Sequence, residues 1–262
     1  MTFKRVVITR PEAQSGPWSQ QLQAKGYETV AVPVLEIAPV EDDAQIQALK
    51  DSVLALDDYA VLIFVSQNAV EFGFNWIEDY WPQFPTGLTC LAVGAKTEQA
   101  MAQRLAKLGI PAQNMKEANS RMDSEALLAL PCLQHVSDTK VLIFRGVGGR
   151  TKLYESLQAR GAKVKHCELY RRLVPRTAEQ QLRDIHLKPG QDIVTLFSGE
   201  SLQNFDALLG KILIEAWEEL AIVVPSQRVA NMAIAMGYRN VTRAENATED
   251  EMLQAIKGIP YV

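Results

Sequence analysis

One long internal match decides the fold. Residues 6–37 (VVITRPEAQSGPWSQQLQAKGYETVAVPVLEI) align without gaps on residues 141–172 (VLIFRGVGGRTKLYESLQARGAKVKHCELYRR). In this alignment LQAKG falls on LQARG, and Arg10 falls on Arg145. Self-similarity at a fixed spacing is the signature of a repeated structural unit, so the match predicts a duplication.

Three further matches follow in the same order along both halves of the chain. They pair residues 63–70 with 195–202, residues 91–101 with 222–232, and residues 114–130 with 240–256. The first of them places Ser66 on Ser198. Together the matches predict two copies of one unit of roughly 130 residues.

Short apolar runs alternate with helix-like segments along the whole chain. The runs are apolar at consecutive positions, which is typical of parallel strands covered on both faces. The predicted strands are Arg5–Thr9, Ala60–Ser66, Thr89–Val93, Lys140–Phe144, Ile193–Ser198 and Ala221–Pro225. The predicted helices are Pro17–Lys25, Ala44–Leu56, Asn68–Glu78, Thr97–Leu108, Ser124–Leu130, Thr151–Arg160, Ser201–Leu213, Gln227–Met236 and Glu249–Ile256. The alternation predicts an α/β fold with two similar parallel-sheet domains.

Two segments at equivalent places in the repeats look like connections between domains. PVLEIAP at 33–39 and ELYRRLVP at 168–175 alternate apolar and polar residues and end at proline. If they pair near Leu35 and Leu169, they form a two-stranded β ladder that joins the domains. Each domain is then discontinuous or inserted. The expected domains are 1–36 plus 174–262 and 40–168, with 35–40 and 168–175 as connecting strands.

Composition excludes several classes of protein. The chain has 262 residues, of which 47% are hydrophobic and 22% charged, an ordinary globular mixture. The net charge of −4 is spread along the chain, which argues against a nucleic-acid partner. Three cysteines without metal-site spacing predict reduced thiols. No signal peptide or membrane-spanning stretch is recognised, so we expect a cytoplasmic protein without membrane contact.

Polar residues follow four of the predicted strands. In open α/β sheets, ligands bind beyond the carboxyl ends of strands, where helix N-termini present free N–H groups. The four junctions are Ser66-Gln67-Asn68, Gly94-Ala95-Lys96-Thr97, Ser198-Gly199-Glu200-Ser201 and Pro225-Ser226-Gln227-Arg228. Their hydroxyl groups suit a carboxylate or phosphate, but helix capping alone also explains them, because a duplication copies caps too.

One arginine stands at the end of the first strand of each repeat, Arg10 in the first and Arg145 in the second. Arg145 leads into the glycine-rich turn Gly146-Val147-Gly148-Gly149-Arg150, whose composition suits an anion. The turn is neither GxGxxG nor GxxxxGK[ST], so those nucleotide-binding motifs are not supported. A tight turn with surface arginines remains the alternative for this segment.

The sequence contains few residues in an arrangement that is typical of a catalytic site. No nucleophile elbow, zinc-protease or kinase motif is found. The histidines, His135, His166 and His186, are isolated in the sequence, and we expect surface or structural roles for them. Tyr170 lies in a predicted connector, where its phenol could donate a proton into a cleft. Packing at a domain junction is the other interpretation of Tyr170.

Taken together, several segments resemble the uroporphyrinogen-III synthase family over essentially the whole chain. The segments are ITRP (8–11), IFVSQNAV (63–70), VGAKT (93–97), LIFRGVGGR (142–150), GAKVKHCELYRR (161–172) and LFSGESL (196–202). The resemblance implies a monomer of two α/β domains joined by a two-stranded ladder, without cofactor or metal. It implies hydroxymethylbilane, a linear tetrapyrrole with eight carboxylates, as substrate. It implies loss of water, closure of the macrocycle and inversion of the terminal (D) ring through a spiro intermediate, in haem biosynthesis.

The resemblance also implies site residues. The family's tyrosine falls on Tyr170, its cleft threonine on Thr97 and its strand-end serines on Ser66 and Ser198, while Ser226 stands at the later helix start. We therefore expect Tyr170 to be catalytic. The expected substrate-binding residues, lining one cleft between the domains, are Arg10, Ser66, Gln67, Asn68, Thr97, Arg145, Gly146, Ser198, Gly199 and Ser226. The role of Arg228 stays open.

Two other functions remain to be weighed. A two-lobed cytoplasmic small-molecule binding protein without catalysis would leave hydroxymethylbilane to close at its uncatalysed rate to the uninverted isomer. A nucleotide- or flavin-binding enzyme would need a phosphate loop, which the motifs do not provide. The expected partner is the linear tetrapyrrole polyanion, and a transient contact with the enzyme of the preceding step is left open.

Overall fold

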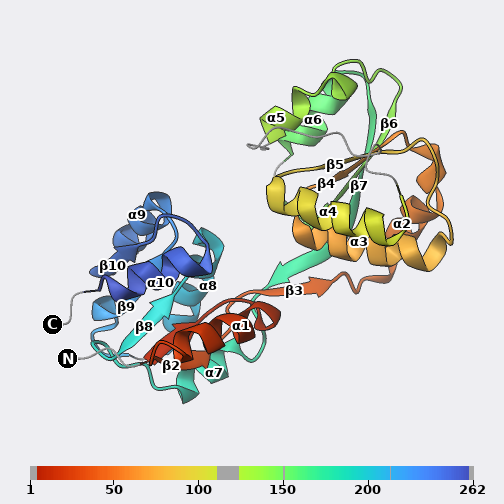
Figure 1. The fold of residues 1–262 in the computed structure, drawn as a ribbon. Coiled ribbons are helices and arrows are strands. Elements are labelled where there is room, and N and C mark those ends of the chain that lie inside the picture. Colours follow the sequence, from red (N-terminus) through yellow and green to blue (C-terminus); the bar gives the residue numbers. More distant parts are fainter. Residues whose placement is uncertain (1–4, 111–123, 150, 213, 260–262) are drawn as a thin grey trace. The chain divides into compact units, whose positions relative to one another are not determined.

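The chain folds into two compact units, each built on a five-stranded sheet. The structure, a computed structural model, describes residues 5–110, 124–149, 151–212 and 214–259. The first unit comprises Met1–Ile37 and Leu173–Val262, and the second comprises Ala38–Arg172. Figure 1 labels the elements of both units. Seven described strand pairs, four in one sheet and three in the other, are parallel. The predicted α/β class with two parallel sheets is therefore confirmed.

The sheet of the first unit takes strands from both ends of the chain. Its strands are, in spatial order, β10 (Asn240–Arg243), β9 (Ala221–Val224), β8 (Asp192–Thr195), β1 (Arg5–Ile8) and β2 (Glu28–Ala31). In the register of β1, Val7 lies beside Val194 of β8 on one side and Val30 of β2 on the other. The apolar residues of these strands, such as Val7 and Val194, are fully buried and form the middle layer of the unit.

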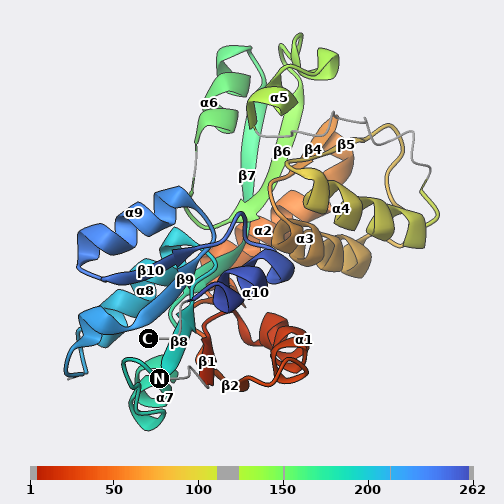
Figure 2. The ribbon, with the colours of Figure 1, turned by 60° about the vertical axis from the view of Figure 1, so that its left-hand side comes forward.

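Helices cover both faces of this sheet. One face packs on α1 (Glu12–Gln23) and α10 (Glu249–Lys257), with Trp18 and Met252 fully buried. The opposite face packs on α7 (Ala178–Asp184), α8 (Gly199–Leu209) and α9 (Gln227–Met236), with Phe205 in its core. Figure 2 shows α8 and α9 on one side of β8, β9 and β10 and α10 on the other. Because helices bury both faces of the sheet, side chains on both sides of a strand are apolar, which explains the apolar residues at consecutive positions.

The sheet of the second unit also has five strands. Its strands are β3 (Glu36–Pro39), β7 (Lys163–Leu173), β6 (Lys140–Gly146), β4 (Val61–Phe64) and β5 (Thr89–Ala92). The register between β6 and β7 shifts after Arg145, so that Gly146 lies beside Tyr170. At the edge, β3 is hydrogen-bonded to β7, and the Val40 N–H donates to the Leu169 carbonyl at 3.3 Å. Leu35 itself lies one residue before β3.

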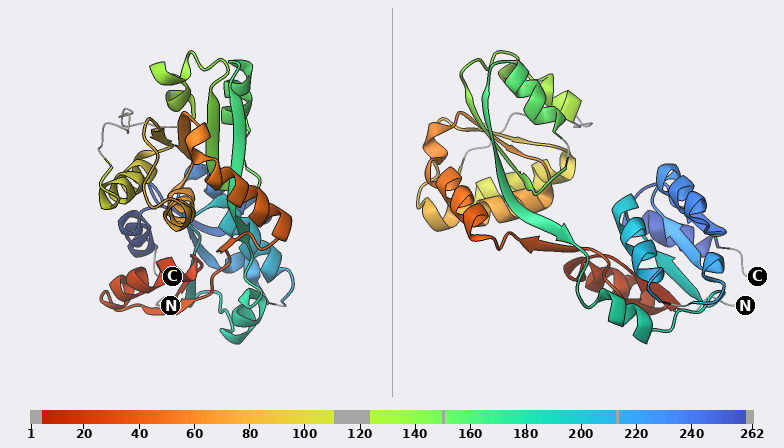
Figure 3. Two further views of the ribbon diagram at one scale, coloured as in Figure 1. Left: turned by 90° about the vertical axis from the view of Figure 1, so that its right-hand side faces the viewer. Right: turned by 180° about the vertical axis from the view of Figure 1, so that it is seen from behind.

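The second unit is also covered on both faces. On one face α5 (Ser124–Leu128) and α6 (Lys152–Ala159) bury Leu127 and Leu157 against the sheet. The other side carries α2 (Asp43–Leu54), α3 (Gln67–Tyr80) and α4 (Ala95–Lys107) (Figures 1 and 3). There Phe64 stacks on both Phe74 and Phe144. The described 3₁₀ turns are Leu56–Asp58, Pro131–Leu133 and Trp217–Glu219.

The structure differs from the sequence-based expectation at a few elements. Each predicted strand is present, but β2, β10 and α7 were not predicted. The two missed strands are edge strands with partly exposed patterns, so they lack the continuous apolar run of a central strand. Helix α1 begins at Glu12, five residues before the predicted start, and Pro17 lies inside it. None of the described helices has the length and apolarity to cross a membrane.

Candidate functional site

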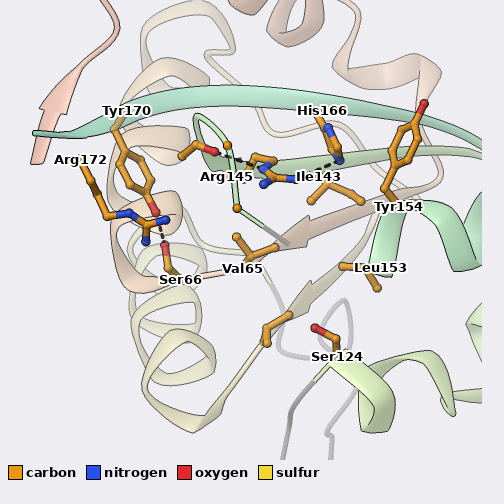
Figure 4. A pocket seen from close by; sticks show the side chains of 14 residues that line it. Val65, Ser66, Ser124, Ile143, Arg145, Leu153, Tyr154, His166, Tyr170 and Arg172 are labelled. Carbon is orange, nitrogen blue, oxygen red and sulfur yellow. Dashed lines mark hydrogen bonds between the residues drawn. The ribbon is translucent and has the colours of Figure 1, made fainter. Parts of the chain in front are cut away.

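A pocket of about 310 Å³ lies in the second unit, where β4, β6 and β7 end. Its described lining combines hydroxyl groups, guanidinium groups and an apolar floor (Figure 4). The lining residues are Val65, Ser66, Val93, Ser124, Ile143, Arg145, Gly146, Gly148, Gly149, Leu153, Tyr154, His166, Tyr170 and Arg172. Of the residues expected from the sequence, Ser66, Arg145, Gly146 and Tyr170 meet here.

Tyr170 is held on three sides. Its ring stacks on Phe72 with 5.6 Å between the centroids, and the residue is 3% exposed. On another side it lies against Gly146, where a Cβ atom would come within 2.6 Å of the tyrosine Cε2. Its hydroxyl lies 2.8 Å from Ser66 Oγ, as Figure 4 shows. Packing and a polar role are therefore combined in one residue, with the hydroxyl directed to the pocket lining.

Ser66 has two roles at one oxygen. It is the N-cap of α3, and its Oγ accepts a hydrogen bond from the Ala69 N–H at 3.0 Å. The same Oγ shares a hydrogen bond with the Tyr170 hydroxyl. Ser66 is thus a helix cap that also lies in the pocket lining.

Arg145 is buried with its guanidinium oriented by two contacts. It is 7% exposed, its Nε donates to the Gly146 carbonyl at 3.1 Å, and its Nη1 lies 3.3 Å from His166 Nε2. Burial and the Arg145 charge lower the pKa of His166, while Glu168 acts in the opposite direction. A neutral imidazole can accept the arginine hydrogen at Nε2. Although His166 is isolated in the sequence, the β6–β7 pairing brings it beside Arg145.

The glycine-rich turn brings a second guanidinium into the same region. Gly149 has a φ of +89°, and a Cβ atom there would lie 2.8 Å from Arg145 Nη2 and 3.9 Å from Arg172 Nη2. The Gly148 N–H donates to the Glu168 carboxylate at 3.4 Å. The turn thus already presents one backbone N–H to an anionic group. Arg150 lies outside the described residues.

Three expected residues of the second unit, Gln67, Asn68 and Thr97, are not among the described lining of this pocket. Gln67 is exposed at the start of α3, and Asn68 follows it. Thr97 is 5% exposed in the first turn of α4, which begins at Ala95 rather than at Thr97. Its N–H donates to the Gly94 carbonyl at 3.0 Å, where Gly94 has a φ of +90°. A glycine in this left-handed conformation provides the chain reversal and lets the helix start earlier.

The first unit has related helix starts. Ser198 caps α8 by accepting from the Ser201 N–H at 3.0 Å, and Ser226 caps α9 by accepting from the Val229 N–H at 3.4 Å. Gly199 lies against Arg228, whose Nη1 would be 3.3 Å from a Cβ atom at that position. Arg228 thus packs beside the start of α8.

Arg10 already has partners in the first unit. Its Nη1 lies 2.5 Å from Glu249 Oε1, and it donates to Gln14 Oε1. Its guanidinium carbon also lies 4.5 Å from the centroid of the Phe197 ring. A substrate carboxylate at Arg10 would therefore compete with Glu249.

In the described part of the chain, no group of three or more His, Cys, Asp or Glu side chains could hold a metal ion. The three cysteines are free, and burial raises the pKa of Cys90 and of Cys167 to about 12. Those two thiols therefore stay protonated at neutral pH. The pocket offers hydrogen-bond donors and positive charge, which suit binding an anion and donating a proton.

Comparisons with known sequences point to one family. A family model described as uroporphyrinogen-III synthase HemD matches residues 16–254. A uroporphyrinogen-III synthase of Escherichia coli is 30% identical over 258 residues, which cover 96% of this chain and 99% of that protein. One from Synechococcus elongatus is 28% identical over 241 residues, covering 88% and 81% of the two chains.

Solved structures agree in fold. The uroporphyrinogen-III synthetase of Helicobacter pylori superposes with a TM-score of 0.61 at 14% identity, over 98% of this chain and 100% of that one. A mutant uroporphyrinogen III synthase from Thermus thermophilus gives a TM-score of 0.59 at 16% identity, over 97% of both chains. At these identities the likeness concerns the fold alone.

Proposed function

Because the chain belongs to the uroporphyrinogen-III synthase family, we propose that it converts hydroxymethylbilane to uroporphyrinogen III in haem biosynthesis. The reaction removes water from the terminal hydroxymethyl group, closes the macrocycle and inverts the D ring. The family match over most of the chain is the observation that carries this proposal. The pocket of the second unit supports it with a phenol, two guanidinium groups and a serine hydroxyl in one place.

Tyr170 is our candidate for the acid that assists loss of the hydroxyl group. The electron-rich pyrrole releases the hydroxyl, and a phenol proton delivered to the departing oxygen completes a water molecule. The Tyr170 hydroxyl lines the pocket while its ring is packed on Phe72 and Gly146. A group fixed in this way can act on a bound substrate without first being ordered.

We assign the remaining polar groups of the expected site to binding the carboxylates of the substrate. In the second unit these are Arg145 and the Gly146 turn, with Gln67, Asn68 and Thr97 kept as weaker candidates because they do not line the described pocket. Ser66 lines the pocket but is not counted among them, because its hydroxyl is hydrogen-bonded to the Ala69 N–H and to Tyr170. In the first unit they are Arg10, Ser198, Gly199 and Ser226, of which Arg10 must exchange Glu249 for the substrate. A charge-assisted hydrogen bond contributes about 1.5–3 kcal/mol. Many such contacts can therefore bind a polyanion to a chain whose net charge is −4.

Positioning is the main contribution that we assign to the protein. Hydroxymethylbilane is expected to close without an enzyme, but to the uninverted isomer. The protein must therefore hold the chain ends in the geometry that leads to inversion, which is a matter of orientation. We further propose that the two compact units act as the two domains, that the protein works as a cytoplasmic monomer, and that it contacts the enzyme of the preceding step transiently.

An isomer-resolved product assay tests the activity. The protein is mixed with hydroxymethylbilane, and the porphyrinogen products are oxidised and separated by isomer. We expect uroporphyrinogen III to form faster than the spontaneous product. Closure at the uncatalysed rate, with the uninverted isomer as product, would instead identify a binding protein.

A further inference from the structure

The hydroxyl groups of Ser66 and Tyr170 form a short polar chain from the start of α3 into the pocket. The Ala69 N–H donates to Ser66 Oγ at 3.0 Å, and Ser66 Oγ lies 2.8 Å from the Tyr170 oxygen. A serine hydroxyl has one hydrogen to donate and two lone pairs to accept with. The Ala69 N–H uses one of these lone pairs. The remaining hydrogen bond can run in either direction between the two hydroxyls.

The direction of that hydrogen bond decides whether Tyr170 can act as an acid. If the phenol donates to Ser66, its proton is directed at the serine. If Ser66 donates to the phenol oxygen, the phenol proton is directed to the pocket and can reach a departing hydroxyl group. We propose that Ser66 is a positioning residue that donates to Tyr170 and thereby directs the phenol proton to the substrate. This inference rests on the proposed function, in which Tyr170 is the acid.

Because the ring of Tyr170 is tightly packed, rotation of its hydroxyl hydrogen is the main conformational freedom of this side chain. Phe72 stacks on the ring, and Gly146 lies so close that even a methyl group would collide with it. The ring position is therefore set by apolar contacts, whereas the hydroxyl hydrogen rotates to suit its partners. Ser66 is the described side chain hydrogen-bonded to that oxygen, so its hydrogen bond can set the direction of the Tyr170 hydroxyl hydrogen.

The helix start favours the proposed direction. Hydrogen bonds in a chain strengthen one another, because a hydroxyl that accepts a hydrogen bond becomes a better donor. Ser66 accepts from an N–H in the first turn of α3, a helix of 14 residues whose N-terminus carries partial positive charge. Both effects make the Ser66 hydrogen more acidic. In turn, a Tyr170 oxygen that accepts from Ser66 donates its own proton more readily.

The duplicated half of the chain provides an internal comparison. Ser198 is aligned with Ser66 and has nearly the same backbone, with φ and ψ of −157° and 164° against −164° and 164°. It caps its helix through the Ser201 N–H at the same 3.0 Å, but its hydroxyl is shared with Ser201 Oγ at 2.9 Å. Leu35 stands where the alignment places Tyr170. Capping therefore needs no tyrosine, and the contact of Ser66 with Tyr170 is an additional feature.

A double-mutant cycle tests the inference. Turnover and KM for hydroxymethylbilane are measured for wild type, Ser66→Ala, Tyr170→Phe and the double variant. We expect each single change to lower kcat about tenfold and to leave KM within about twofold. We expect the double variant to be no slower than Tyr170→Phe, because Ser66 acts through the phenol. Losses that multiply, or a KM that rises with Ser66→Ala, would make Ser66 an independent substrate-binding residue and overturn the proposal.

Two further variants separate positioning from helix capping. Asp42→Ala removes a cap of the same kind in the same unit, where Asp42 Oδ1 accepts from the Gln45 N–H at 3.0 Å. It should lower the melting temperature as Ser66→Ala does, yet keep kcat. Ser66→Thr retains the hydroxyl and should restore kcat to within about threefold of wild type. If Asp42→Ala slows turnover as much as Ser66→Ala, the effect is one of stability and the inference fails.

Failure of the inference differs from failure of the proposed function. A wild-type protein that forms no uroporphyrinogen III overturns both. An active wild type with multiplying losses overturns the role of Ser66 alone.

Discussion

At the scale of single residues, Tyr170 combines a packed ring with a hydroxyl that lines the pocket. Tyr170→Phe keeps the ring and its contacts with Phe72 and Gly146 and removes the proton donor. General acids contribute about 10²–10⁴-fold, and we expect the lower side, about tenfold in kcat, because the pyrrole already activates the leaving group. Ring inversion should be retained. The isomer-resolved assay measures both quantities.

Two other outcomes would change the role of Tyr170. Turnover within about twofold of wild type would make it a packing residue. Slow turnover with the uninverted isomer as product would show that it orients the substrate rather than protonates it.

His166 is the residue from which we expect a pH effect on stability. Burial and Arg145 lower its pKa in the folded chain, so below about pH 6.5 the unfolded chain binds more protons at this residue. The contribution of His166 to stability is therefore fully present above that pH and declines as the pH falls toward the lowered value. His166→Gln should flatten the fall in melting temperature between about pH 7 and pH 5 relative to wild type.

An exposed histidine serves as the matched control. His135→Gln should give a melting-temperature profile parallel to that of wild type, because the His135 side chain is exposed. Wild type and His166→Gln with parallel profiles would contradict the assignment.

At the scale of elements, the end of β6 requires a residue without a side chain. A Cβ atom at Gly146 would lie 2.6 Å from Tyr170 Cε2 and 2.9 Å from its Cζ. Gly146→Ala should therefore displace the phenol and destabilise the second unit by about 1–3 kcal/mol, as overpacking does. We expect kcat to fall at least as far as in Tyr170→Phe, measured with the same assay.

A second glycine gives the reference for this change. Gly16 lies in α1, where a Cβ atom would meet nothing within 4 Å. Gly16→Ala should leave turnover unchanged, because Gly16 lies in the first unit and, apart from its chain neighbours, nothing lies close to the added methyl group. Equal activity of Gly146→Ala and wild type would show that the ring is free to move without consequence.

At the scale of the whole molecule, each unit has its own sheet and core, so we expect them to respond separately to a local change. Asp192 is 2% exposed in β8 and pairs with Arg5 of β1 through two bonds of 2.7 Å. It also accepts from the Lys188 N–H. Asp192→Asn leaves the Arg5 charge without its partner and should destabilise the first unit by about 3 kcal/mol.

Hydrogen exchange measures this prediction strand by strand. Exchange should accelerate in β1 and β8 and stay unchanged in β4 and β6. Glu245→Gln, which breaks an exposed pair with Arg243 in the first unit, should change little. Equal acceleration in both sheets would show that the two units unfold together.

The sequence by itself determined the α/β class, the duplication and the family. These properties follow from local patterns of residues. Inner strands such as β4 and β6, for example, are apolar at consecutive positions because helices cover both their faces. The edge strands β2 and β10 are not predicted by this pattern. Each has a neighbouring strand on one side only and is partly exposed, so it lacks a continuous apolar run. Ser66, Arg145 and Tyr170 were each recognised singly, from a strand end, a glycine-rich turn and a connector.

The tertiary structure decided which of these residues meet. Ser66 and Tyr170 are 104 positions apart and come together because β4, β6 and β7 are adjacent in the sheet. The register shift after Arg145 sets Tyr170 against Gly146, and the same pairing brings His166 beside Arg145. Which strands become neighbours depends on packing between distant parts of the chain, so the pattern within one strand does not show which side chains of another strand it will meet.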